Sequence, residues 1–381
     1  MAASQLSSTQ SAPRERAEAL SQFQVFGQQF RKNKTAIFGL LMLIVLYSGA
    51  LFAPLIAPYG MDEYSTTDIT GFAPPTRIYW QDPQTGALGP FVYNVKRERD
   101  LTSFELKFTE DRSTKCPINF LVRSSERQYK LFGFIPADLH LFGVNPPCKV
   151  FLFGADEVGR DLFSRIWYGS QVSLTIGIVA VLLSFSIGLF MGGIAGYFGG
   201  WLDNVIMRIT EILSAVPDLF LLAILTSYLP KSVDPLLLFY AMVAVLSFVG
   251  WGGLARVVRG QILSLREADF VQAAVALGAQ PGRIIARHLL PNIASYMLTV
   301  AFLAIPSFIL TESTLSYLGY GVREPQASWG ALLQDVQDGG FGTFIYRPWI
   351  LIPGFFIVLA ILAWNLFGDG VRDAFDPKKR R

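Results

Sequence analysis

Long apolar stretches without charge are the sequence feature that most restricts how this chain can fold. Residues 35–57 and 171–198 contain no Asp, Glu, Lys or Arg. A helix of roughly 20 apolar residues crosses the hydrocarbon core of a bilayer, because all of its backbone hydrogen bonds are made inside the segment. The whole chain is only 16% charged, whereas soluble domains are roughly 25% charged. The composition therefore predicts a membrane protein and argues against a soluble globule, a disordered chain or a nucleic-acid binder.

Four further stretches approach the length of a membrane crossing, although some contain charges. The predicted fold is an all-α polytopic membrane protein with six transmembrane helices, and a strand-containing insert separates the first two. The expected crossings are residues 35–57, 171–198, 205–229, 235–255, 291–318 and 348–368. The first is expected to be a retained anchor, because its charged leader is too long for a secretory signal.

Basic residues indicate which ends of these helices face the cytoplasm, where Lys and Arg concentrate. Three basic clusters fall on one side of a six-helix arrangement, which predicts that the N-terminal segment 1–34 and the tail 371–381 are both cytoplasmic. The clusters are Arg31, Lys32 and Lys34; Arg256, Arg259, Arg266, Arg283 and Arg287; and Arg372, Lys378, Lys379, Arg380 and Arg381.

The same side assignment places residues 58–165 outside the cytoplasm. Polar and apolar residues alternate over 103–108, a pattern typical of half-buried strands. Cys116 and Cys148 both lie in this insert, where an oxidising compartment would allow a disulfide. Two free thiols remain the alternative.

The chain lacks the common signatures of catalysis and of nucleotide binding. It contains no G-x-x-x-x-G-K-[ST], H-E-x-x-H or G-x-S-x-G motif, so we expect no P-loop, metalloprotease or nucleophile-elbow chemistry. With two histidines and two cysteines, no metal site or cofactor of its own is expected. Energy for transport would have to come from a partner or an ion gradient.

A few ionisable residues fall within the expected crossings. Arg208 and Glu211 are three residues apart and can pair on one helix face. Pro217, Asp218 and Glu312 are candidates for gating or for lining a path, since Pro217 interrupts a helix and intramembrane charges often mark function. Plain helix packing is the competing interpretation for each.

The connection between the fourth and fifth crossings carries signals for two short helices. Acidic residues begin residues 266–282, alanines fill the middle, and Gly278 precedes Pro281, as at the start and stop of a helix. Residues 283–290 are also compatible with a helix, which is expected to end at Pro291. Small residues beside exposed arginines suit insertion into a groove of a cytoplasmic partner.

Within this loop, Gln272-Ala273-Ala274, then Gly278, and then His288-Leu289-Leu290-Pro291 resemble the EAA loop of ATP-binding-cassette importer permeases. The resemblance is to the oligopeptide, dipeptide and nickel group, and specifically to its OppC-like or DppC-like member. Residues 153–165, 195–200, 315–319, 328–330 and 365–373 are similar to further motifs of that group. Gln272 replaces the usual Glu, and the long insert resembles that of the branch transporting microcin C and larger peptides.

This resemblance implies a permease core over residues 166–370 with a cytoplasmic coupling loop over 259–291. It also implies a second permease subunit, two ATPase subunits that bind ATP and Mg²⁺, an extracytoplasmic peptide-binding protein, and a location in the bacterial inner membrane. The residues expected to couple to the ATPases are Glu267, Asp269, Gln272, Ala273, Ala274, Gly278, Arg283, His288, Leu290 and Pro291.

Other functions remain open at this point. Within the family, nickel or another small solute could replace peptide as the substrate. A self-sufficient ion-coupled transporter would rely on Arg208, Glu211, Asp218 and Glu312. A sensor or adhesion domain on a membrane anchor would leave the cytoplasmic loop unexplained, and we rank it last.

Overall fold

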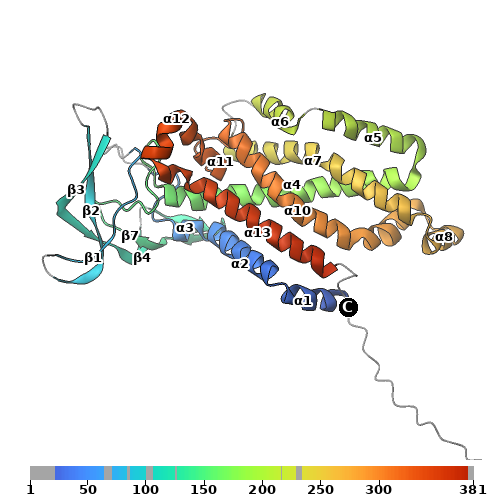
Figure 1. Cartoon of the computed structure of the whole chain (residues 1–381), viewed down its shortest axis with the longest axis horizontal. Coiled ribbons are helices and arrows are strands. Elements are labelled where there is room, and N and C mark those ends of the chain that lie inside the picture. The colour runs from blue at the N-terminus through green and yellow to red at the C-terminus, as the bar shows by residue number, and fades with distance from the viewer. Residues whose placement is uncertain are drawn as a thin grey trace, which may run out of the picture.

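A bundle of long helices forms most of the molecule, and the β-strands lie at the end opposite α8 (Figure 1). The computed structural model describes residues 22–63, 71–83, 86–99, 106–124, 127–215, 217–228 and 234–375. The helices are α1 (Gln22–Lys32), α2 (Lys34–Leu51), α3 (Ala53–Ile56), α4 (Leu162–Phe198), α5 (Gly200–Ala215), α6 (Asp218–Ser227), α7 (Pro235–Leu265), α8 (Asp269–Ala276), α9 (Pro281–Ile284), α10 (Leu290–Tyr317), α11 (Trp329–Leu332), α12 (Gln334–Tyr346) and α13 (Ile352–Phe375). A π-helical turn, Ile285–Leu289, precedes α10, and a 3₁₀ turn, Pro348–Leu351, precedes α13.

Among the described residues, five helical segments are long and apolar enough to cross a membrane. They are Lys34–Leu51, Leu162–Phe198, Leu237–Leu265, Pro281–Tyr317 and Pro348–Phe375. Their main apolar core joins α2, α4, α10 and α13 around buried side chains that include Leu46, Ile166, Ile309 and Ala360. The chain is thus a mostly helical, multi-pass protein.

The expected third crossing, residues 205–229, is not a single helix in the structure. It is divided between α5 and α6, with Pro217 between them. Proline has no N–H to donate, and its ring clashes with the carbonyl four residues earlier, so a continuous helix cannot pass through this position without distortion.

Two other helix boundaries also differ from the sequence prediction. α4 begins at Leu162, inside the expected insert, because the Asp161 side chain caps it by accepting from the backbone N–H of Ser164 at 2.8 Å. The expected stop at Pro291 is wrong, since the helical path runs from Pro281 through the π-turn into α10. Proline is tolerated there because it lies in the first turn of α10, where its missing N–H costs little.

Close approach of α4 and α7 depends on small residues in α4. A Cβ added to Gly192 would lie 2.5 Å from the carbonyl oxygen of Ala255, and one added to Gly196 would lie 2.9 Å from Cβ of Ile262. Glycines four residues apart form one stripe along a helix and allow a neighbouring backbone to approach closely.

The segment between α3 and α4 contains seven described strands: β1 (Tyr79–Gln81), β2 (Leu88–Arg99), β3 (Leu106–Pro117), β4 (Asn119–Arg123), β5 (Tyr129–Leu131), β6 (Ile135–Ala137) and β7 (Leu139–Gly143). They form an antiparallel sheet β1-β2-β3 and two antiparallel pairs, β4-β7 and β5-β6. β3 covers residues 106–108 of the alternating pattern, and residues 103–105 lie outside the described residues.

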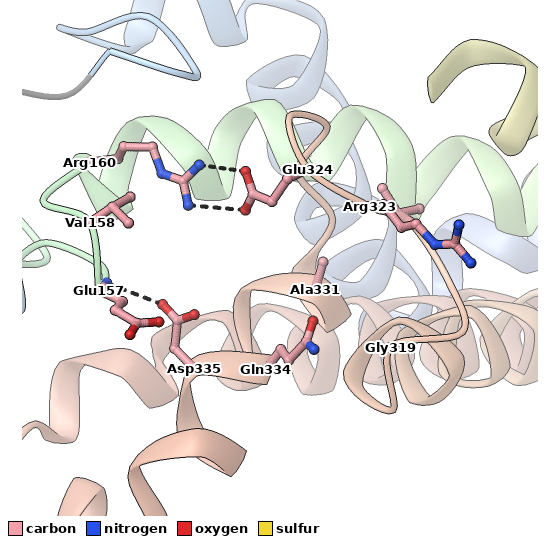
Figure 2. A pocket seen from close by; sticks show the side chains of 10 residues that line it. Glu157, Val158, Arg160, Gly319, Arg323, Glu324, Ala331, Gln334 and Asp335 are labelled. Carbon is pink, nitrogen blue, oxygen red and sulfur yellow. Dashed lines mark hydrogen bonds and ion pairs between the residues drawn. The ribbon is translucent and has the colours of Figure 1, made fainter. Parts of the chain in front are cut away.

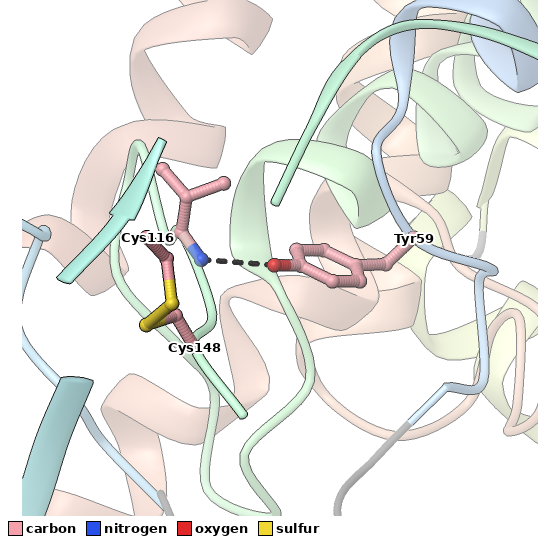
Figure 3. Close-up of a disulfide and its surroundings, with 4 residues drawn as sticks. Tyr59, Cys116 and Cys148 are labelled. Carbon is pink, nitrogen blue, oxygen red and sulfur yellow. Dashed lines mark hydrogen bonds between the residues drawn. A yellow bond between two sulfur atoms is a disulfide. The ribbon is translucent and has the colours of Figure 1, made fainter. Parts of the chain in front are cut away.

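Cys116 and Cys148 form a disulfide beside Tyr59 (Figure 3). Their Cα atoms are 6.2 Å apart, and both side chains belong to a small apolar core with Val92 and Val150. The hydroxyl of Tyr59 accepts a hydrogen bond from the backbone N–H of Val150 at 2.8 Å. The disulfide and this bond connect the strands to the segment that leads from α3.

Candidate functional site

The loop between α7 and α10 forms an elbow at the end of the bundle that lies opposite the strands (Figure 1). α8 starts with Asp269, which suits the positive end of the helix dipole. After α8, Gly278 has a φ of +75°, and α9 begins at Pro281. A positive φ is readily adopted only by glycine, so Gly278 makes the turn between the two short helices.

One face of α8 is packed and the other is exposed. Val271 and Ala274 are buried in an apolar cluster with Ile262 of α7 and Ile284 of α9. Three apolar side chains on the remaining surface are exposed: Phe270 at 42%, Val275 at 46% and Leu277 at 88%. The elbow is therefore held against the bundle by one face while the other presents exposed apolar groups.

The other residues singled out by the loop motif are mostly on this exposed surface. The Gln272 amide donates to the carbonyl oxygen of Arg266 at 3.0 Å, and Glu267 lies 3.4 Å from the Arg266 guanidinium. Ala273, Arg283 and Pro291 are also exposed, whereas His288 and Leu290 are half-buried.

A second polar cluster lies at the opposite end of the bundle and was not assigned a role from the sequence. The guanidinium of Arg165, which is 2% exposed, pairs with Asp156 and with Glu324. Arg160 pairs with the same two carboxylates, and Figure 2 shows its pair with Glu324. We call Asp156, Arg160, Arg165 and Glu324 the ion network. It joins the start of α4 to the segment between α10 and α11.

The charges of this network oppose the effect of burial on Glu324. Desolvation favours the neutral carboxyl group, but the hydrogen bonds and positive charges of Arg160 and Arg165 outweigh it and lower the pKa of Glu324. Glu324 therefore stays ionised and keeps both arginines paired.

A pocket of about 530 Å³ opens beside the ion network. Arg160, Arg323, Glu324, Glu157 and Asp335 bring both signs of charge to its lining (Figure 2). Desolvation, together with repulsion from Asp156, raises the pKa of Asp335 to about 6.

Glu312 is fully buried, and serine side chains from two helices surround its carboxylate. It accepts hydrogen bonds from the hydroxyl groups of Ser316 at 2.7 Å and Ser173 at 3.1 Å. Ser173 also accepts from the backbone N–H of Trp329 at 3.1 Å. Glu312 thus joins α10, α4 and α11.

The remaining intramembrane candidates lie around α5 and α6. Arg208 and Glu211 form an exposed ion pair at 2.8 Å. The carbonyl of Pro217 accepts from the backbone N–H groups of Phe220 and Leu221, so Pro217 immediately precedes α6 and takes part in its first turn. Asp218 is its first residue.

Comparisons with known proteins identify the family of this chain. The family described as "Binding-protein-dependent transport system inner membrane component" matches residues 185–381, and "N-terminal TM domain of oligopeptide transport permease C" matches residues 21–75. The chain therefore belongs to the binding-protein-dependent transport permeases. More narrowly, it is an OppC/DppC-type permease subunit of an ATP-binding-cassette importer, a multi-pass protein of the inner membrane.

The matches with individual relatives cover most of the length of each relative. The oligopeptide transport system permease protein OppC of Bacillus subtilis is 40% identical over 237 residues, which are 62% of this chain and 74% of that protein. The dipeptide transport system permease protein DppC of the same organism is 40% identical over 238 residues, 62% of this chain and 71% of that protein. OppC of Haemophilus influenzae is 41% identical over 251 residues, 65% of this chain and 78% of that protein.

Among solved structures, an inward-facing form of the MetNI methionine ABC transporter is similar with a TM-score of 0.45 and 18% identity. The match covers 56% of this chain and 97% of that chain.

Proposed function

We propose that this permease subunit carries peptides across the inner membrane and is driven by ATPase subunits that dock on the elbow formed by α8 and α9. The main observation behind this proposal is that the elbow has two different faces. Val271 and Ala274 are buried against the bundle, whereas the exposed apolar residues are Phe270, Val275 and Leu277. A rigid elbow transmits movement of a docked partner into α7 and α10, which it joins directly. ATP and Mg²⁺ are then bound by the partners and not by this chain.

Peptide is the proposed cargo because relatives at 40% identity are oligopeptide and dipeptide permeases. The pocket beside the ion network supports this proposal, since its lining carries both signs of charge and a peptide has an ammonium and a carboxylate end. A second permease subunit would complete the path, and an extracytoplasmic binding protein would deliver the peptide.

The proposed orientation places α8, α1 and both termini in the cytoplasm and the strands outside. The lengths and positions of α5 and α6 support a sixth crossing made by the two helices together, because they connect α4 to α7 along the bundle (Figure 1). In the permease expressed without its ATPase subunits, a cysteine placed at Leu277 should be labelled by a membrane-impermeant maleimide in inverted vesicles and not in intact cells. Labelling in intact cells would contradict this orientation.

The docking proposal is tested by Leu277→Asp in the complete transporter. Leu277 is 88% exposed, so the charge should leave folding unchanged but place a carboxylate in an apolar interface. We expect fewer ATPase subunits to co-purify and ATP-dependent peptide uptake into proteoliposomes to fall. Leu88→Asp is the matched control, because Leu88 is 84% exposed in β2.

Normal uptake by the Leu277→Asp transporter would contradict docking at the elbow. Uptake by the purified chain alone, driven by a proton gradient without ATP, would instead support an ion-coupled transporter.

A further inference from the structure

The hairpin of β5 and β6 ends in an unusually apolar turn. Phe132 and Gly133 have φ values of +55° and +83°, which make the turn tight. Phe134 is 73% exposed, Phe132 44% and Ile135 43%. Exposure of three neighbouring large apolar side chains to water is unfavourable, since burial of each in an apolar environment lowers the free energy. We therefore expect the tip of the hairpin, formed by Phe132, Phe134 and Ile135, to lie in an apolar environment.

The hairpin is held at a fixed place beside α3. The Tyr129 hydroxyl donates to the carbonyl oxygen of Leu139 at 2.6 Å, and Nδ1 of His140 lies 2.9 Å from the carbonyl oxygen of Ala57. Arg127 donates to the carbonyl oxygen of Pro58 at 3.2 Å. These contacts tie the base of the hairpin to the segment that leaves the membrane after α2 and α3.

The position of the tip relative to the bilayer follows from α2. Its 18 residues correspond to about 27 Å of helix, close to the roughly 30 Å of a hydrocarbon core. Val45 and Leu51 expose 62% and 52% of their surface along this helix. Phe52, the next residue, meets Phe132 with ring centroids 5.9 Å apart in an edge-on arrangement. The tip thus continues the apolar surface of α2 at the level where the helix ends.

We propose that the β5–β6 tip, through Phe132, Phe134 and Ile135, inserts into the outer leaflet of the bilayer and anchors the extracytoplasmic insert to the membrane surface. We take the occupant of this surface to be lipid because the tip continues the exposed apolar side chains of α2, a helix long and apolar enough to cross a membrane. Aromatic side chains are favoured at the boundary between hydrocarbon and headgroups. The inference concerns the insert and does not depend on which solute is carried.

Spin labels test this proposal in the complete transporter reconstituted in lipid nanodiscs. Single cysteines replace Phe134 or Ile135, with Leu88→Cys as the control. Leu88 is 84% exposed in the β1-β2-β3 sheet, which stands farthest from the helices (Figure 1). Mass analysis checks that Cys116 and Cys148 stay paired and unlabelled. Collisions with oxygen, which concentrates in lipid, are compared with collisions with a water-soluble nickel chelate.

Labels at 134 and 135 should give an oxygen-to-nickel collision ratio several-fold higher than the label at 88. A ratio equal to that at 88 would overturn the proposal, because the tip would then lie in water. Protection from both reagents would also overturn it, since a protein partner would then cover the tip. In the wild-type transporter, a phospholipid with a photoreactive acyl chain should crosslink within residues 129–137, and a failure to crosslink there would count against lipid contact.

Discussion

Arg165 and Glu324 are 159 residues apart in the sequence, yet Nη2 of Arg165 donates to Oε1 of Glu324 over 2.7 Å. The same guanidinium pairs with Asp156, and both Arg165 and Asp156 are almost completely buried. The contact fixes the first turn of α4 against the segment that follows α10. In the proposed mechanism, a movement that begins at the elbow and travels along α10 would reach α4 at the other end of the bundle through this contact.

Replacement of Arg165 by Met should destabilise the subunit strongly. Asp156 would lose its buried partner and keep only Arg160. Complete removal of a partner from a buried ion pair costs about 3–5 kcal/mol, which is therefore the upper limit expected here. We expect a lower midpoint of thermal unfolding in detergent, measured by loss of the monodisperse peak after heating. Lys96→Met is the control, since the Lys96–Asp111 pair is largely exposed and exposed pairs contribute little. Equal midpoints for the two variants would mean that the ion network does not stabilise the fold.

The ion network could not be predicted from the sequence, although three of its four members lie in a motif noted there. Asp156, Arg160 and Arg165 are close together in the chain, but Glu324 joins them only when α10 returns to the start of α4. The elbow is different, because local signals specify it: Asp269 at the start of α8, Gly278 at the turn and Pro281 at the start of α9. Local patterns are readable without tertiary structure, whereas pairings between distant residues depend on it.

The membrane helices show the same difference between features that local sequence predicts and features that depend on tertiary structure. Uninterrupted apolar residues predict membrane-crossing helices where α4 and α13 lie, since roughly 20 apolar residues are enough to cross the hydrocarbon core. The apolar composition of residues 205–229 predicts one crossing, whereas in the structure this stretch is divided into α5 and α6 around Pro217. The role of Glu312 was also beyond the sequence, because the serines that satisfy it come from α4 and α10.

Asp335 should make stability depend on pH. Its pKa in the folded protein is raised to about 6, chiefly by desolvation and then by repulsion from Asp156. The folded state therefore binds more protons than the unfolded state between the ordinary value near 4 and about 6. This contribution stabilises the protein at acidic pH and is lost as the pH rises through 6. Asp335→Asn should reduce the difference in unfolding midpoint between pH 5 and pH 7.5. An unchanged difference would show that Asp335 does not titrate in this range.

Gly192 and Gly193 provide a matched pair on α4. A Cβ at Gly192 would lie 2.5 Å from the carbonyl oxygen of Ala255, whereas the nearest atom to a Cβ at Gly193 is 3.4 Å away. Gly192→Ala should therefore force α4 and α7 apart at a cost of about 1–3 kcal/mol, and Gly193→Ala should be close to neutral. Thermal unfolding of the two variants checks this order. An equal change in both variants would mean that the close approach of Gly192 to α7 does not determine stability.

Gly278 allows the geometry of the elbow to be tested separately from its surface chemistry. A Cβ at this position would meet no atom within 4 Å, so only the φ of +75° opposes a larger residue. A left-handed conformation costs an L residue about 1–2 kcal/mol, and Asn tolerates it best. Peptide-stimulated ATPase activity should therefore be highest with Gly at position 278, lower with Asn, lower again with Ala and lowest with Val.

The control for this series is Gly282, which lies in α9, has no positive φ and also meets nothing within 4 Å. Gly282→Ala should be neutral or slightly stabilising, because alanine is the better helix former. If the Gly278→Val transporter had the same peptide-stimulated ATPase activity as the wild type, the turn between α8 and α9 would not need a residue with a positive φ. The elbow would then dock in a shape different from the one described here.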